Sequence, residues 1–445
     1  MRAKHLLTRA ACVLLCAALL TGVAFAATYS PSFSLSAKRV LLINLDSGGV
    51  LYEKEADEPI EPSLLAQLMT VIVAIEHIPD LDNTMISMSG YVQDQMYTRN
   101  IELGGIRLAG LYKGEEIAAK KLLYAVMLRD AADAAMMLAD YVGDGSIKYF
   151  TEMMNERAAE LGATHTHFTD PAGLADGESY TTARDMALIA QYALSVPLIC
   201  EMMETQFYDG GPTARQQTLY WNTTNKLIVP SSEYYNPSIR GIKVGWHDAL
   251  GSYAVTTARR DGYTYLAVLL GCTGGSVNES AAAAFAETTR LCQWAFETFS
   301  VKVLLEEGRS FGEVPLRLGA SSKDFLRVTS AENFTALIPS DIEPSSIRMD
   351  VRLPASVTAP VERGDLIGEV HLILGEEELG VVGIVAAEDA ALSRLLMTLD
   401  RMQSITRTFW FKFAVVFLVL LIVLYGFLIV EKQRSRYRYR GTRRR

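Results

Sequence analysis

An uncharged apolar run, FAVVFLVLLIVLYGFLIV at residues 413–430, constrains this 445-residue chain more than any other feature. A helix of about 20 residues crosses roughly 30 Å of hydrocarbon, so the run is long enough for one membrane span. Residues 431–445 then carry eight cations and one acid, which the positive-inside rule keeps in the cytoplasm. The sequence therefore predicts a single-pass membrane protein with an extracytoplasmic bulk and a basic tail suited to anionic lipid head groups.

The first 26 residues have the pattern of a secretory signal peptide. Three cations precede a short apolar run, and Ala24-Phe25-Ala26 forms a small-residue cleavage site. An uncleaved anchor is the alternative, although the apolar run is short for a span. We therefore expect residues 1–26 to direct export.

The two ends hide the charge of the body. The chain totals −9, but residues 401–445 contribute +10 and residues 1–26 contribute +3, which leaves −22 on residues 27–400. So acidic a body argues against nucleic acid as a partner, because such binding depends on neutralising phosphates. Three cysteines remain beyond residue 26, an odd number, and His165 and His167 lack a nearby third ligand. We expect no metal and no cofactor.

Periodicity between the ends predicts an α+β domain followed by a small all-β domain. Alternating apolar residues flank Ser47-Gly48-Gly49, and two β-rich runs flank Asp261-Gly262, as in hairpins. Helical periodicity marks the segments 63–78, 119–143, 149–162, 182–195 and 281–299. Ser63 is a possible N-cap of the first of these helices. From about residue 300, short β-rich pieces alternate with Gly and Pro turns.

Several segments, in the same order, resemble the serine D-alanyl-D-alanine carboxypeptidases, low-molecular-mass penicillin-binding proteins that trim peptidoglycan stem peptides. The segments are LLINLDSGGVLYEKEADEPIEPS, ELGATHTHFTDPAGL with YTTARDMALIAQYAL, WNTTNKLI, GIKVGWHDALGSYAVTTARRDG and APVERGDLIGEVHLILGEEELGVVGIVAAED. The resemblance implies a transpeptidase domain, an antiparallel sheet flanked by helices, and then a small β domain. The expected organisation is a signal at 1–26, a carboxypeptidase-like domain at 27–299, a β-sandwich-like domain at 300–387, a stalk at 388–412, a transmembrane helix at 413–430 and a tail at 431–445.

The family's first motif, S-x-x-K, supplies a nucleophilic serine and a lysine base one helical turn later. Aligned through Leu68-Met69-Thr70, the serine position holds Leu64 and the lysine position holds Gln67. A shift of one residue to Ser63 does not help, because Ala66 stands three residues on. In the whole chain, no serine precedes a lysine by three residues. The residues of the covalent route are absent.

The second motif, S-x-N, supplies a hydroxyl for proton transfer and an amide that holds the substrate. Asp133-Ala134-Ala135 fixes its register, so Asp130 takes the serine position and Ala132 the asparagine position. The third motif, K-T-G, is a strand that pairs with the substrate while its lysine attracts a carboxylate. It corresponds here to Lys243, Val244 and Gly245, so Lys243 and Gly245 are the two remaining substrate-binding positions.

Three hypotheses follow. The chain is an inactive, membrane-anchored homologue that acts as a scaffold or regulator with cell-wall proteins as partners, because losing nucleophile and base removes the covalent route. Alternatively, it retains residual or altered peptidase activity, with Asp130 as a base for water. A third possibility is a non-catalytic module that uses Lys243 to hold the stem peptide. The alignment also predicts an Asp130–Lys243 ion pair, against the alternative that both side chains point to solvent.

Overall fold

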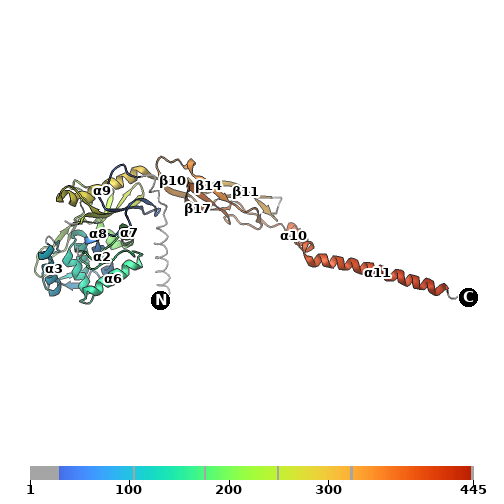
Figure 1. The fold of residues 1–445 in the computed structure, drawn as a ribbon, viewed down its shortest axis with the longest axis horizontal. Coiled ribbons are helices and arrows are strands. Elements are labelled where there is room, and N and C mark those ends of the chain that lie inside the picture. The colour runs from blue at the N-terminus through green and yellow to red at the C-terminus, as the bar shows by residue number, and fades with distance from the viewer. Residues whose placement is uncertain (1–29, 104–105, 175–176, 248–249, 321–323, 442–445) are drawn as a thin grey trace. The chain divides into compact units, whose positions relative to one another are not determined.

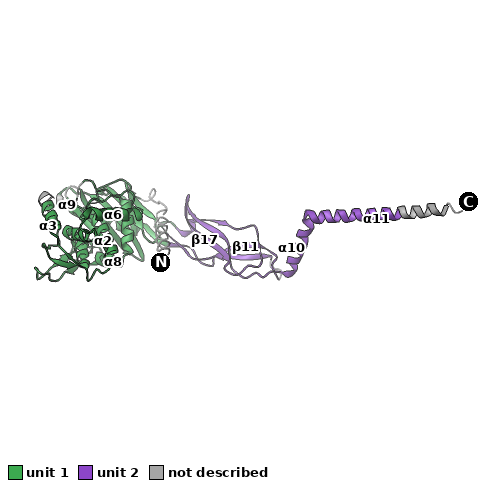
Figure 2. Cartoon of the chain, turned by 90° about the horizontal axis from the view of Figure 1, so that it is seen from below, with its two compact units in different colours: residues 1–301, 337–342 green, residues 302–336, 343–445 purple. Residues whose placement is uncertain are grey.

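The computed structural model describes residues 30–441, apart from 104–105, 175–176, 248–249 and 321–323. The expected signal at 1–26 lies outside the described residues. The chain divides into two compact units, which are residues 1–301 with 337–342 (unit 1) and residues 302–336 with 343–445 (unit 2), shown in Figure 2.

Unit 1 is built on a five-stranded antiparallel sheet in the order β2-β1-β9-β8-β7. Its strands are β1 (Arg39–Asn44), β2 (Val50–Lys54), β7 (Ile239–His247), β8 (Gly251–Arg260) and β9 (Tyr263–Cys272). Both expected hairpins are confirmed. Asp261 and Gly262 each have a positive φ, of 53° and 89°, as in a two-residue type I′ turn.

Helices cover both faces of this sheet (Figure 1). One face carries α9 (Val277–Thr298). A cluster of helices packs on the other, comprising α2 (Ala66–His77), α4 (Ala119–Arg129), α5 (Ala132–Val142), α6 (Ile147–Glu160), α7 (Ala183–Leu194) and α8 (Pro197–Glu204), with α3 (Gly90–Leu103) beside α5. Side chains alternate across a strand, so Leu41 and Ile43 enter the helical core while Val40 and Leu42 enter the α9 core.

Short elements complete unit 1. They are the 3-10 turns η2 (Ser63–Leu65) and η3 (Lys226–Ile228), the pair β3 (Met85–Ser87) with β4 (Glu116–Ala118), and the hairpin β5 (Phe207–Asp209) with β6 (Tyr220–Asn222).

Two expectations about the helices are wrong in detail. Ser63 does not cap the first helix; it has a φ of 49° in η2, and α2 begins only at Ala66. The periodic segment 119–143 is not one helix, because Asp130 adopts a left-handed conformation (φ 58°, ψ 36°) that ends α4 before α5 starts. This turn allows the Asp130 side chain to leave the helix surface.

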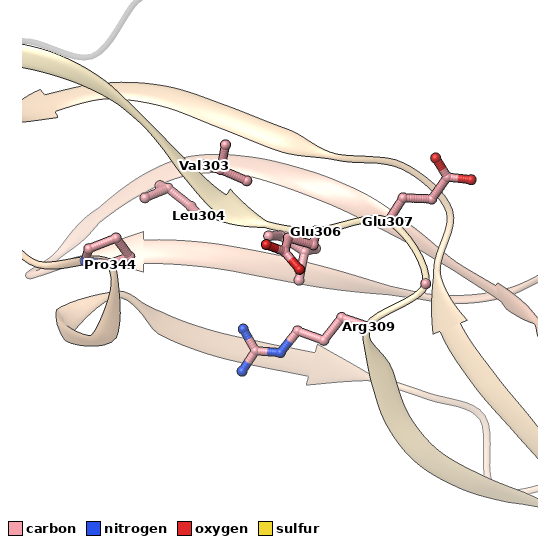
Figure 3. Close-up of a pocket in the computed structure, with 8 residues that line it drawn as sticks. Val303, Leu304, Glu306, Glu307, Arg309 and Pro344 are labelled. Atoms are coloured by element: carbon pink, nitrogen blue, oxygen red, sulfur yellow. The ribbon is translucent and has the colours of Figure 1, made fainter.

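Unit 2 contains a six-stranded sheet in the order β14-β16-β17-β12-β11-β15. Its strands are β11 (Ser310–Arg317), β12 (Phe325–Ser330), β14 (Arg348–Arg352), β15 (Val357–Thr358), β16 (Leu366–Leu374) and β17 (Glu377–Ala386); β10 (Phe299–Leu305) and β13 (Phe334–Pro339) pair separately, and η4 (Pro344–Ser346) precedes β14. An open cavity of about 500 Å³ lies in unit 2 between the end of β10 and Pro344, with Arg309 at its side (Figure 3). It contains none of the motif positions.

The chain ends in two helices, α10 (Arg394–Arg407) and α11 (Phe409–Gly441), separated by Thr408 in an extended conformation. Residues Phe409–Val430 of α11 are long and apolar enough to cross a membrane, and they contain the expected span. The apolar pair α7 and α8 is bent by 103° and belongs to the core of unit 1.

Candidate active site

Three segments of unit 1 bring the motif positions together. The first is the start of α2 with η2, the second is the turn between α4 and α5, and the third is β7. Helix α2 packs against α4 and α5, and β7 lies beside η2. The topology therefore assembles the place that an active site would occupy.

Asp130 and Lys243 form the ion pair that the sequence predicted. Lys243 Nζ lies 2.8 Å from Asp130 Oδ1, and neither side chain is exposed to solvent. The ammonium also donates to the Val126 carbonyl at 2.9 Å. Lys243 is thus held by an internal carboxylate and an internal carbonyl, and its charge is neutralised inside the protein.

Arg107 is a site residue that the sequence analysis missed. Its guanidinium lies 2.6 Å from Asp130 Oδ2, while its side chain remains 35% exposed. Its loop is fixed by Asp133, whose buried carboxylate accepts backbone N–H bonds from Ala109 and Gly110. Burial raises the pKa of Asp133, although those N–H donors oppose the rise. The sequence did offer one signal for a second cation beside Asp130. A buried carboxylate needs polar partners for both of its oxygens, and Lys243 alone supplies a partner for one.

Gln67, at the position that the family resemblance assigns to the lysine base, links three segments of unit 1 by hydrogen bonds. Its side chain is fully buried, and its Nε2 donates to the carbonyls of Ala172 at 2.8 Å and Asp130 at 3.2 Å. One amide therefore joins α2 to the α4–α5 turn and to the loop that contains Ala172. A neutral amide can make these bonds, but it cannot act as a base near neutral pH.

Leu64, at the position that the family resemblance assigns to the nucleophile, packs against the helical core. Gly173, with φ 67°, lies so close that an added Cβ would be 2.4 Å from the Ser63 carbonyl oxygen and 2.9 Å from Leu64 Cα. A neighbouring carboxylate, Asp170, fixes this loop by accepting N–H bonds from Ala172 and Leu174. The backbone at Gly173 thus packs directly against the backbone of Ser63 and Leu64.

Tyr253 fills the space against Gly245. The two residues are paired across β7 and β8, and an added Cβ at Gly245 would lie 2.1 Å from the Tyr253 hydroxyl oxygen. Burial, together with the negative charge of Asp130, raises the pKa of the Tyr253 phenol well above its ordinary value. The phenol therefore stays neutral and offers no base.

The two remaining motif positions, Val244 and Ala132, have apolar side chains that can neither form hydrogen bonds nor transfer a proton. Val244 points into the core on the α9 side of the sheet. Ala132 is buried at the start of α5, and its backbone N–H donates to the Arg107 carbonyl at 2.9 Å. Within the described residues, no group of three His, Cys, Asp or Glu side chains could hold a metal ion.

The fold defines a class of protein. A five-stranded antiparallel sheet between helices, followed by a small all-β unit, is the transpeptidase-like fold of the penicillin-binding proteins. Residues 25–274, more than half of the chain, match the D-alanyl-D-alanine carboxypeptidase family, and residues 299–391 match the C-terminal domain of penicillin-binding protein 5. The chain therefore belongs to the D-alanyl-D-alanine carboxypeptidase family.

Relatives match both parts of the chain. It is 26% identical over 378 residues to D-alanyl-D-alanine carboxypeptidase DacF of Bacillus subtilis, which covers 85% of this chain and 90% of the relative. It is 25% identical over 357 residues to DacC of Escherichia coli, covering 80% and 84%.

Solved structures share the fold. Penicillin-binding protein 5 of Haemophilus influenzae aligns with a TM-score of 0.60 at 21% identity, covering 82% of this chain and all of that one. The Streptomyces K15 DD-transpeptidase aligns with a TM-score of 0.53 at 27% identity, covering 60% and 99%.

Proposed function

We propose that this protein is a membrane-anchored, catalytically inactive member of its family, which acts as a scaffold or regulator in cell-wall assembly. The observation that carries the proposal is the cluster formed by the buried pair Asp130 and Lys243 with the partly exposed Arg107. Both oxygens of Asp130 are held by cations, and the Lys243 ammonium is held by Asp130 and a backbone carbonyl. The groups that would bind or activate a substrate bind each other.

The cluster also bears on the two alternatives. A base for water needs a carboxylate oxygen that faces a reactant, whereas both oxygens of Asp130 accept from protein cations at 2.6 and 2.8 Å. A module that holds a peptide carboxylate needs an available cation, whereas the Lys243 side chain has no solvent exposure. Both arguments favour inactivity over residual hydrolysis and over stem-peptide binding at this site.

A penicillin label tests inactivity. The full chain in detergent is incubated with a fluorescent penicillin, beside DacF of Bacillus subtilis as the reference relative. We expect no covalent label on this chain, because Leu64 provides no nucleophile. A stoichiometric label on the purified chain would overturn the proposal.

Two further assays separate the alternatives. Release of D-alanine from a pentapeptide, lost in Asp130→Asn, would establish residual hydrolysis instead. Binding to isolated cell walls that is lost in Lys243→Ala would establish a wall-binding module instead. We expect no D-alanine release, and we expect wall binding to be the same with and without the Lys243→Ala change.

The proposed arrangement in the membrane follows from the ends of the chain. Residues 1–26 act as an export signal, α11 spans the membrane once, and the basic residues 431–445 remain in the cytoplasm. A protease added outside intact spheroplasts should therefore digest the chain before residue 413 but spare an epitope fused after Arg445. Loss of that epitope would contradict the proposed topology.

A further inference from the structure

We propose that Tyr253 covers β7 at Gly245 independently of the changed motif residues, so that neither a stem peptide nor a penicillin can dock along β7. This inference rests on the proposed function and deepens it. It assigns a specificity-determining role to a residue that lies outside all three motifs.

The position of Tyr253 follows from strand register. Lys243 and Gly245 are two residues apart on β7, so they face the same side of the sheet. Their partners on β8 are Val255 and Tyr253, and both belong to the core on the helical side. Tyr253 therefore stands on the face of the sheet that carries Lys243.

The ring takes the space that Gly245 leaves free. An added Cβ at Gly245 would lie within 2.1–2.5 Å of the Tyr253 hydroxyl oxygen and the adjacent ring atoms. Real side chains essentially never approach this closely, so only glycine is compatible with this position of the ring. The glycine that the family resemblance assigns to substrate binding instead accommodates an internal side chain.

The Tyr253 ring lies inside unit 1 next to the first motif. Only 4% of the residue is exposed, and it belongs to the same core cluster as Leu65 and Ala66, while β7 lies beside η2. Because the ring covers Gly245 on β7, a ligand that paired with β7 next to Leu64 would meet the ring. Restoring the motif residues would therefore leave this part of β7 covered.

Restoring the motifs tests this directly. The motif-restored chain carries Leu64→Ser, Gln67→Lys, Asp130→Ser, Ala132→Asn and Val244→Thr. We expect no penicillin label on it while Tyr253 is present, and a stoichiometric label once Tyr253→Ala is added. The inference is overturned if the motif-restored chain is labelled equally with Tyr253 present. It is also overturned if neither chain is labelled although both unfold cooperatively. If the proposed inactivity is itself wrong, the result is different: penicillin labels the native chain, which carries none of these changes.

A second measurement keeps the test valid if five changes destabilise the fold. In the full chain with Cys12, Cys16 and Cys200 each changed to Ser, a Ser63→Cys change places a thiol in η2, which lies beside β7. We expect Tyr253→Ala to speed alkylation of that thiol by about tenfold, because thiol reactivity follows exposure, and Tyr253→Phe to leave the rate unchanged. An equal rate in all three chains contradicts the inference. The buried thiols of Cys272 and Cys292 must stay unreactive, which shows that unit 1 remains folded.

Discussion

Two charged clusters in this protein are built on the same plan with opposite signs. In unit 1, one carboxylate, Asp130, lies between two cations. In unit 2, one imidazole, His371, lies between the carboxylates of Glu369 and Glu378, at 3.0 and 2.7 Å. The first joins distant segments of the chain, whereas the second lies within the β16–β17 hairpin.

Solvent makes the two clusters unequal. Asp130 and Lys243 are fully buried, so each needs the other to offset its lost hydration. Both glutamates beside His371 are half-exposed, at 50% each, so water and salt can replace their interactions. We therefore expect the first cluster to determine the stability of unit 1, and the second to have only a small, pH-dependent effect on unit 2.

The largest effect should come from Lys243→Met. It leaves the Asp130 carboxylate buried with only Arg107, so we expect unit 1 to lose about 3 kcal/mol of unfolding free energy. Urea unfolding of the full chain in detergent measures this loss by tryptophan fluorescence. Trp221, Trp246 and Trp294 lie in unit 1, and the fourth tryptophan, Trp410, lies in α11.

Two variants provide the controls for Lys243→Met. Arg107→Met removes a cation that is 35% exposed, so we expect a loss of only about 1 kcal/mol. Lys226→Met removes an exposed cation and should change stability by less than about 0.5 kcal/mol. If Lys243→Met behaves like Lys226→Met, the contrast between the two clusters is wrong.

The next effect tests the tight packing beside the buried cluster. Gly245→Ala forces a Cβ into the Tyr253 ring, and we expect this overpacking to cost about 2–3 kcal/mol. In a Tyr253→Ala background the same change should be nearly neutral, because the obstacle is gone. The coupling energy from this double-mutant cycle is the measurement. Gly49→Ala, whose Cβ would meet only the Ser47 hydroxyl at 3.3 Å, is the matched control; additive effects would disprove the contact.

A smaller effect is expected for the neutral part of the site. Gln67→Leu leaves the Ala172 and Asp130 carbonyls buried without their donor, which should cost about 1–3 kcal/mol. Gln293→Leu is the control, since that exposed side chain donates to Glu297 on the surface of α9, and we expect a change below about 0.5 kcal/mol. Equal losses in the two variants would show that burial is not the deciding factor.

Much of this architecture could be predicted from the sequence, because periodicity and turn residues are local signals. The hairpin at Asp261-Gly262 and the apolar span of α11 were found this way. The Asp130–Lys243 pair was also predicted, because the family register places the two residues opposite each other. When the residues around a motif are recognisable, they still show where a changed residue within that motif lies in the fold.

The features that sequence analysis missed are set by tertiary contacts. The helical periodicity of residues 119–143 runs on without a break in the sequence, but the structure has a left-handed turn at Asp130. There the Asp130 side chain bonds to residues 23 and 113 positions away. Arg107 and Tyr253 belong to no motif, and only strand register and loop path bring them to the site. Tyr253 has the β-propensity of any strand tyrosine, so its pattern gives no hint that it covers Gly245.

The smallest effect is the pH dependence of the unit 2 cluster. The hydrogen bonds of His371 to Glu369 and then Glu378 raise the pKa of its imidazole above the ordinary value of 6.5, against the opposing charge of Arg352 on β14. The protonated form is therefore favoured in the folded state. Its stabilising effect is complete below the ordinary pKa, and it disappears as the pH rises through the raised, folded-state pKa.

Melting curves of the native chain and the His371→Gln variant at several pH values test the direction of this pKa shift. We expect the difference in Tm of unit 2 between the native chain and His371→Gln to be largest below the ordinary imidazole pKa of about 6.5 and to decrease as the pH rises above it. Added salt should reduce the difference at the acidic end, because the partners are half-exposed, and it should leave the Lys243→Met loss in unit 1 nearly unchanged. A difference that grows with rising pH would mean that His371 is held as the neutral imidazole, and one insensitive to salt would mean that both clusters are equally shielded from water.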